Sequence, residues 1–127
     1  SSFDIKNRQV VLAEINLRQL FGSINLEKKF VSIPKYPAIT RDISFVIKQD
    51  VAVKELLRAI EEKGAPLLRS GYVADYYQGK QIPVGFIGLT ISCIYRQDDR
   101  TLTEEEVAPL HNAICSLLEE RFAIKVR

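Results

Sequence analysis

The strongest constraint on the fold is a hydrophobic period that changes from two to about 3.6 and back again, twice, after residue 41. In residues 41–48, RDISFVIK, the apolar residues Ile43, Phe45 and Ile47 alternate with their neighbours, which is typical of a half-buried strand. In residues 53–60 the apolar side chains recur at the i, i+3, i+4 and i+7 positions, which predicts an amphipathic helix. The chain therefore begins this region with a strand followed by a helix.

Signals for helix ends and further strands follow. Asp50 is a residue type that caps helix N-termini, and Gly64 is expected to end the helix in the left-handed conformation. Residues 67–77 and 86–96 each predict a strand. The stretch between them, QGKQIPVG, has a glycine near each end and an internal proline, so we expect a loop.

A second helix and a last strand complete the pattern. Thr103 and Glu106 have the spacing of a capping box, and consecutive glutamates occupy the first turn, where the helix dipole favours them. Pro109 interrupts the helix pattern, so we expect either a kink there or a helix that starts later. The final residues, FAIKVR, predict a short strand with Ile124 and Val126 facing inward.

The order strand, helix, strand, strand, helix, strand predicts an α+β fold: a ferredoxin-like βαββαβ antiparallel sheet with both helices on one face. Residues 9–17, QVVLAEINL, predict a further strand in an N-terminal extension. Pro34 and Pro37 mark a linker, so we divide the chain into an extension, residues 1–32, and a main domain, residues 33–127. The other face of the sheet is expected to stay uncovered.

The uncovered face is the candidate functional surface. If Ile43 and its partners meet the helices, the period of two places four polar side chains on the opposite face: Ser44, Thr90, Ser92 and Arg96. In the second strand a charge at Asp75 would be costly in a core, so we place Asp75 and Tyr77 on the open face. Strict alternation then turns Tyr72, Ala74 and Tyr76 inward.

An aromatic ring on a flat polar sheet is a stacking platform for an unpaired base. A carboxylate beside it, such as Asp75 beside Tyr77, can accept hydrogen bonds from base N–H groups. Nearby hydroxyl groups can donate or accept, and Arg96 could contact a phosphate or stack. The alternative is structural: Tyr77 packs against the linker, and Asp75 is a solvated charge.

The charge distribution limits how RNA could bind. Residues 1–41 carry seven Lys or Arg and three Asp or Glu, a balance of +4, whereas residues 42–127 carry eleven and thirteen, a balance of −2. Because residues 42–127 are slightly acidic, general attraction to phosphates cannot be the main source of their affinity for RNA. Individual side chains on the surface would instead have to recognise exposed bases.

Nothing in the sequence predicts catalysis, a metal site or a bound cofactor in this segment. The only histidine, His111, has no acid or thiol at a ligand-like spacing, and the acidic stretch of residues 98–106 lacks the D-x-D-x-D-G pattern. The glycines do not form G-x-G-x-x-G. Cys93 and Cys115 are expected to be free thiols in a reducing compartment, and we expect no signal peptide and no membrane span.

Three stretches, PKYPAITRDISFVI, VADYYQGKQIPVG and YRQDDRTLTEEEV, resemble the ferredoxin-fold anticodon-binding domain that ends the beta chain of bacterial phenylalanyl-tRNA synthetase. The similarity covers about residues 33–127. A fourth stretch, VVLAEINLRQL, resembles the strand that closes the preceding catalytic-like module of that beta chain. The resemblance therefore implies a C-terminal piece of a longer chain, with residues 1–32 a remnant of that module and a linker.

The resemblance also implies roles for particular residues. Asp75, Tyr77 and Gly79 match a D-x-Y-x-G pattern whose acid and ring belong to the anticodon-contacting surface. Gly88 stands where relatives usually carry a serine, which removes one hydroxyl from the expected base contacts. Residues 96–103 match R-x-x-D-R-T-L-T, a segment expected mainly to build a turn and a helix cap, with Arg96 or Arg100 reaching RNA.

As a whole, the resemblance implies tRNA(Phe) as partner and a cytoplasmic ligase that uses ATP and magnesium and is assembled from two alpha and two beta chains. Aminoacylation would occur on the alpha chain, so this segment would do no chemistry alone and would contact neither DNA nor a membrane. The main alternative is a ferredoxin-like domain that senses a small ligand or dimerises through its open sheet. A dimer interface would favour apolar residues on that face, which is mostly polar. An acylphosphatase-like enzyme is a further alternative, but no phosphate loop supports it.

Overall fold

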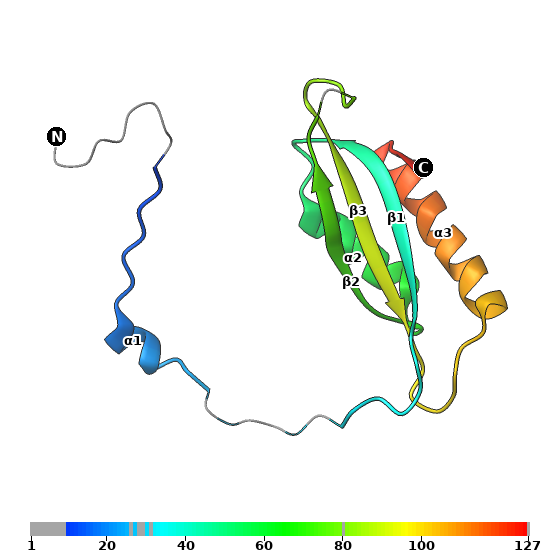
Figure 1. The fold of residues 1–127 in the computed structure, drawn as a ribbon, viewed down its shortest axis with the longest axis horizontal. Coiled ribbons are helices and arrows are strands. Elements are labelled where there is room, and N and C mark those ends of the chain that lie inside the picture. The colour runs from blue at the N-terminus through cyan, green and yellow to red at the C-terminus, as the bar shows by residue number, and fades with distance from the viewer. Residues whose placement is uncertain (1–9, 26, 28–29, 31, 80, 127) are drawn as a thin grey trace. The chain divides into compact units, whose positions relative to one another are not determined.

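The computed structural model describes residues 10–25, 27, 30, 32–79 and 81–126, and the chain divides into two compact units, residues 1–32 and 33–127 (Figure 1). In the first unit a short helix, α1 (Leu17–Phe21), is capped by the Asn16 side chain, which accepts hydrogen bonds from the Arg18 and Gln19 N–H groups.

The strand predicted over residues 9–17 is wrong for the described residues 10–16, which form no strand; residue 9 lies outside them. Val11 and Leu12 are more than nine-tenths exposed, at 93 % and 92 %. A strand needs a neighbour to complete its hydrogen bonds, and apolar alternation cannot supply one.

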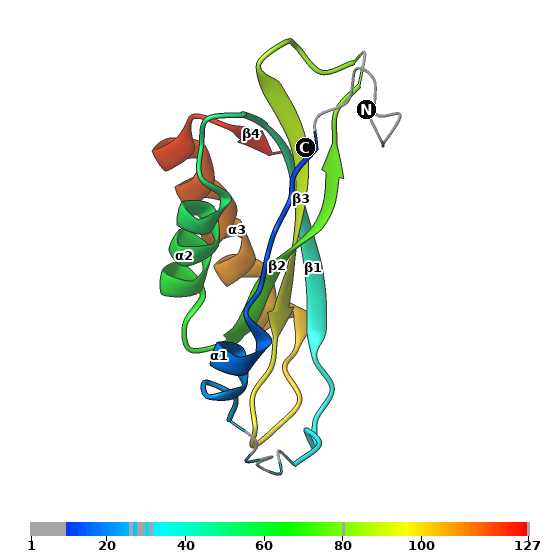
Figure 2. The ribbon, with the colours of Figure 1, turned by 90° about the vertical axis from the view of Figure 1, so that its left-hand side faces the viewer.

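The second unit contains the predicted order: β1 (Ile39–Lys48), α2 (Val53–Gly64), β2 (Leu68–Tyr77), β3 (Phe86–Tyr95), α3 (Glu104–Phe122) and β4 (Lys125–Val126). The strands form one antiparallel sheet in the order β2-β3-β1-β4. Figure 2 shows α2 and α3 on the same side of this sheet. The predicted ferredoxin-like α+β fold is therefore confirmed.

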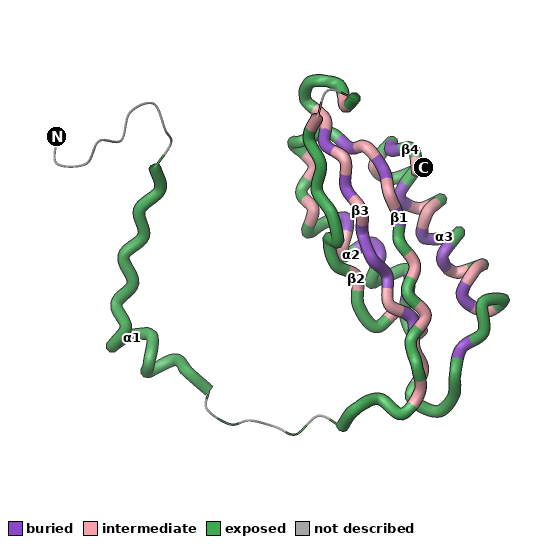
Figure 3. Tube along the Cα trace, viewed as in Figure 1, coloured by how far each residue is buried: buried purple, intermediate pink, exposed green. Residues whose placement is uncertain are grey.

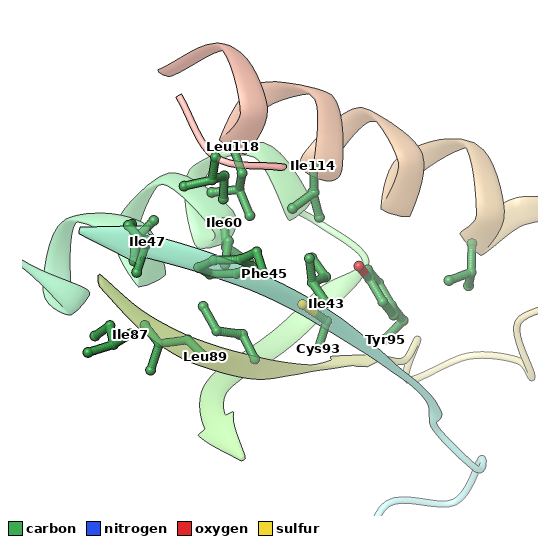
Figure 4. Close-up of a cluster of buried hydrophobic side chains, with 14 of the residues drawn as sticks. Ile43, Phe45, Ile47, Ile60, Ile87, Leu89, Cys93, Tyr95, Ile114 and Leu118 are labelled. Atoms are coloured by element: carbon green, nitrogen blue, oxygen red, sulfur yellow. The ribbon is translucent and has the colours of Figure 1, made fainter. Parts of the chain in front are cut away.

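The core lies between the sheet and the two helices. Figure 4 shows Ile43, Phe45 and Ile47 of β1 packed beside side chains of β3 and beneath Ile114 and Leu118 of α3. Each fully buried side chain of this size contributes about 1.5–3 kcal/mol to folding. In Figure 3 buried residues concentrate on β1, β3 and the inner sides of the helices, whereas β2, at the edge of the sheet, is mostly exposed.

The ends of α2 differ from the prediction. Its N-cap is Ala52, which makes no side-chain cap bond, so Asp50 does not cap the helix. Gly64 is the last helical residue and is buried, and the helix leaves through Ala65 in an extended conformation, so the left-handed cap at Gly64 is wrong. A Cβ atom at Gly64 would lie 2.5 Å from the Leu68 Cβ atom. Close packing against the start of β2, not backbone freedom, explains this glycine.

The start of α3 agrees with the prediction. Thr103 is the N-cap, and the capping box with Glu106 is present. Glu106 also accepts two hydrogen bonds from Arg100, of 2.8 and 2.5 Å. Pro109 lies inside the helix on an exposed position, so the helix does not start later.

The edge strand β2 contains a bulge at Ala74. Val73 pairs with Ile91 and Asp75 pairs with Thr90, so two steps along β2 match one step along β3. The extra residue reverses the alternation of the side chains on its N-terminal side. Tyr72, which pairs with Ser92, therefore lies on the open face, and its predicted inward position is wrong. Asp75 and Tyr77 lie on the open face as predicted.

Candidate nucleic-acid interface

The open face is the side of the sheet opposite α2 and α3 (Figure 2). Paired residues of neighbouring antiparallel strands point to the same face, so the register defines rows of side chains across the sheet. Three central rows, each read from β2 through β3 to β1, are Tyr72–Ser92–Asp42, Asp75–Thr90–Ser44 and Tyr77–Gly88–Val46. Five of the six sequence-predicted site residues belong to these rows.

Four of the predicted residues come together around one shallow hollow of about 250 Å³. Asp75, Tyr77, Ser44 and Thr90 line it, together with Val46, Ile82 and Gly88. This volume is smaller than the roughly 300–1,000 Å³ of ordinary small-molecule pockets. The hollow is therefore suited to one flat group laid against the sheet rather than to an enclosed ligand.

The polar groups of the hollow are held by local hydrogen bonds. The Ser44 hydroxyl oxygen lies 2.9 Å from that of Thr90, so one hydroxyl donates to the other. Because each hydroxyl has one hydrogen, the accepting one keeps its own free to donate elsewhere. One Asp75 carboxylate oxygen accepts a hydrogen bond of 2.8 Å from the Tyr76 N–H group. The site thus offers both acceptors and a donor.

The ring of Tyr77 is half exposed and lies next to Gly79. A side chain at position 79 would overlap the hydroxyl group of Tyr77, so only glycine leaves the ring in this position. This contact gives a physical reason for the glycine in the D-x-Y-x-G stretch.

Gly88 lies on the same row as Tyr77, beneath the side chain of Ile82 from the β2–β3 loop. A Cβ atom at Gly88 would lie 3.0 Å from the Ile82 Cδ1 atom and 3.5 Å from the Tyr77 carbonyl oxygen. The absence of a side chain at position 88 therefore leaves room for an apolar contact from the loop, and this part of the hollow is apolar.

Ser92 lies one row away from the hollow and is only 5 % exposed. Its hydroxyl donates a hydrogen bond to the carboxylate of Asp42, its partner in the β1–β3 register. The structure thus leaves Ser92 little surface of its own, and the group presented to solvent at this place is Asp42, which is exposed.

Arg96 is not brought together with the other predicted residues. It lies six residues beyond Thr90 along the chain, about 20 Å at the usual rise of a strand. Its N–H group donates to the Leu67 carbonyl, and its Nε atom lies 3.9 Å from an Asp98 carboxylate oxygen. Arg100, the other expected arginine, is engaged with Glu106 at the start of α3.

Sequence reasoning missed two lysines on the open face. Lys125 pairs with Val46 and so extends the Tyr77 row, while Lys48 pairs with Phe86 one row further along. Both are exposed. The signal was present, because the predicted inward positions of Ile124 and Val126 already turn Lys125 outward. These cations lie at the end of the face that carries Tyr77.

Within the described part of the chain, no group of three or more His, Cys, Asp or Glu side chains is placed to hold a metal ion. None of the helices that the structure describes is both long enough and apolar enough to cross a membrane.

Comparison with known proteins gives independent evidence for the family to which this chain is related. Residues 34–127 match the model of the family described as ferredoxin-fold anticodon binding domain. The chain is 36 % identical over 126 residues to the phenylalanine–tRNA ligase beta subunit of Clostridium tetani, covering 99 % of this chain and 16 % of that protein. Identity to the beta subunit of Bacillus cereus is 34 %, covering 98 % and 15 %, and to that of Trichormus variabilis 40 %, covering 93 % and 15 %. The chain spans about one sixth of the length of these relatives, as the 16 % coverage shows.

Proposed function

The chain belongs to the ferredoxin-fold anticodon binding domain family, and from this premise we propose that its open sheet face recognises the anticodon of tRNA(Phe) by holding unstacked bases. The observation that carries the proposal is the hollow that gathers Asp75, Tyr77, Ser44 and Thr90. A stacking ring, an anionic acceptor and hydroxyl groups within one shallow site are the elements with which proteins read single-stranded bases.

Each side chain of the hollow has a distinct role in binding a base. The exposed ring of Tyr77 stacks against the face of a base, which holds the base without selecting it strongly, because every base has such a face. Asp75 accepts hydrogen bonds from N–H groups on the base edge, as guanine and cytosine can offer. The hydroxyl pair of Ser44 and Thr90 supplies a donor and an acceptor on the floor of the hollow. Selectivity thus comes from the polar groups and affinity largely from the ring.

Phosphate contacts play a smaller part. The balance of −2 over residues 42–127 gives the domain no general attraction for RNA. Among the residues that the structure describes, Lys125 lies in the Tyr77 row and Lys48 in the next row. Each phosphate that these lysines neutralise would steepen the fall of log affinity with log salt by at most about one. The salt dependence of binding is therefore shallow.

The domain works as a part of a larger enzyme. The relatives named above are beta subunits of phenylalanine–tRNA ligase, and by extension this chain is a segment of such a subunit. In the whole enzyme it would work in the cytoplasm beside an alpha chain, in an assembly of two alpha and two beta chains. ATP and magnesium would serve the aminoacylation reaction on the alpha chain, and the role of this segment is to bind and position tRNA.

The test is a comparison of binding to anticodon stem-loop RNAs of tRNA(Phe) with matched and altered anticodons, at one stated low salt concentration. The chain should prefer the matched RNA, and Tyr77→Ala should weaken that binding by roughly 1–3 kcal/mol, the usual loss of one base–aromatic stack. Tyr76→Ala is the matched control, because Tyr76 is similarly exposed on the same strand but faces the helix side. Equal affinity for both RNAs, unchanged by Tyr77→Ala, would refute the proposal.

A further inference from the structure

We propose that Tyr72 is a second stacking platform on the open face, and that it holds a different nucleotide of the same RNA from the one on Tyr77. This inference rests on the proposed function and adds a residue and a path for the RNA strand. It follows from the bulge in β2: if Ala74 were an ordinary paired residue and Asp75 kept its place, the ring of Tyr72 would lie on the helix side.

Two observations place Tyr72 on the open face. Its partner in β3 is Ser92, whereas its neighbour Val73 pairs with the core residue Ile91. On its other side, a Cβ atom at Gly71 would lie 3.6 Å from Ile60 and 3.9 Å from Leu57, both in α2. Residues 71 and 73 thus face the helix, and Tyr72, between them, faces away.

The two tyrosines are equally available. Tyr72 is 48 % exposed and Tyr77 is 49 % exposed, so about half of each side chain is open to a partner. Neither ring belongs to the buried core of the domain. A large aromatic side chain left half open on a polar face has apolar area that a base could cover.

The surroundings of Tyr72 repeat the chemistry of the first site. Its row continues with the hydroxyl of Ser92 and the exposed carboxylate of Asp42, joined by a hydrogen bond. The Ser92 hydroxyl fixes one Asp42 oxygen, and the remaining lone pairs of that carboxylate can accept N–H groups from a base edge. A phenol and a carboxylate therefore occur together twice on this face: Tyr77 and Asp75 on one strand, and Tyr72 and Asp42 in one row with Ser92 between them.

The distance between Tyr72 and Tyr77 requires that the two rings contact different nucleotides. The β3 partners of the two tyrosines, Gly88 and Ser92, are four residues apart, about 13 Å along the strand. Neighbouring nucleotides of a stacked strand rise only about 3.4 Å. The two rings therefore cannot hold neighbouring stacked bases, and an RNA strand that reaches both crosses the hollow of Thr90 between them, roughly along β3.

The experiment uses the whole chain and a set of anticodon stem-loop RNAs in which one loop nucleotide at a time lacks its base. Each RNA is titrated against the unmodified chain and against Tyr72→Ala, Tyr77→Ala and Tyr76→Ala, with circular dichroism to show that all fold. Tyr72→Ala should lower affinity for the intact RNA about 5-fold to 150-fold, while Tyr72→Phe, which keeps the ring, and Tyr76→Ala should not.

The base-deleted RNAs then locate the nucleotides. The affinity of the Tyr72→Ala variant should be the same whether or not one particular loop base is present. The affinity of the Tyr77→Ala variant should be unaffected by the loss of a different loop base. If Tyr72→Ala binds like Tyr76→Ala while Tyr77→Ala is weakened, or if both variants become insensitive to the same base, the inference is wrong and the proposed function stands. If neither Tyr72→Ala nor Tyr77→Ala changes binding, or the unmodified chain does not bind, both fail.

Discussion

The hydroxyl group of Tyr77 lies where a side chain at position 79 would have to stand. Because the overlapping atoms are the far end of a side chain, Gly79→Ala should move the ring rather than unfold the domain. We expect this variant to lose RNA affinity by an amount up to that of Tyr77→Ala, roughly 1–3 kcal/mol, with little change in the free energy of unfolding. Titration with anticodon stem-loop RNA and urea unfolding measure the two quantities.

A double-mutant cycle controls this first prediction. In a chain that already carries Tyr77→Ala there is no ring to displace, so adding Gly79→Ala should have almost no further effect on RNA binding. If the two losses simply add, Gly79 acts on RNA by another route.

At Gly64, packing and helix propensity act in opposite directions. Alanine is the better helix former by about 1 kcal/mol, but its Cβ atom would lie 2.5 Å from the Leu68 Cβ atom. Overpacking of this kind costs about 1–3 kcal/mol, so we expect Gly64→Ala to lower the free energy of unfolding. Lys63→Ala, at the neighbouring exposed position of the same helix, is the control and should be nearly neutral. A stabilised Gly64→Ala protein would show that Leu68 can move aside at no cost.

His111 gives the domain a pH dependence near neutrality. Its Nδ1 atom lies 2.9 Å from the Tyr95 hydroxyl oxygen in the core, and burial lowers the pKa of the imidazole below its ordinary value of 6.5. As the pH falls through 6.5, the unfolded chain therefore gains a proton that the folded chain does not, and stability decreases. The loss is at most about 1.4 kcal/mol for each pH unit.

Urea unfolding between pH 7.5 and 5.5 measures this effect. His111 is the only histidine, so no other imidazole contributes in that window. His111→Gln, which keeps an acceptor for Tyr95, should unfold with a flatter pH dependence; an unchanged slope would assign the effect to other groups.

Glu106 should give a second pH dependence in acid. Two hydrogen bonds from Arg100 and one of 2.9 Å from the Thr103 N–H group lower the pKa of this carboxyl to about 2, from an ordinary value near 4.5. A lowered pKa stabilises the fold above the unfolded value, so this contribution should disappear as the pH falls from 4.5 towards 2. The Glu106→Gln variant should therefore lose less stability than the unmodified chain between pH 5 and pH 3. Thermal unfolding at these two pH values measures the loss, and Glu105→Gln, at an exposed neighbouring position, is the control.

The two free cysteines should react slowly in the native protein. Burial raises the pKa of the Cys93 thiol to about 11, and it also raises the pKa of the Cys115 thiol. The thiolate is the reactive form, so a disulfide reagent at pH 8 should modify Cys93 only as fast as the domain opens. Cys115, which is only partly buried, should react sooner, and both should react at once in denaturant. Rapid native modification of the single-cysteine variant Cys115→Ser would contradict this.

The fold was predictable because its signals are local and repeated. The alternation around Phe45 and the helical spacing around Ile60 each identify an element and the face that it buries, and together they fix the βαββαβ order. The same period placed Asp75 and Tyr77 on the open face, which the structure confirms.

What could not be predicted depends on contacts between distant residues. The bulge at Ala74 exists only through the register of β2 against β3, so Tyr72 was assigned to the wrong face. Gly64 looked like a helix cap because its reason, the closeness of Leu68, is a packing contact. The strand predicted before residue 17 had the pattern of a strand, but pattern alone supplies no pairing partner.

The bulge at Ala74 also reconciles the spacing of Tyr72 and Asp75 with the face that they share. The two residues are three positions apart, an odd number, so a strand without a bulge would turn one of them under α2. Deleting Ala74 would make the spacing even, and a regular strand would then keep both the phenol and the acid on the open face. A shortening of this strand by one residue should therefore spare both the core and RNA binding, whereas a shortening by two residues would place the two side chains on opposite faces.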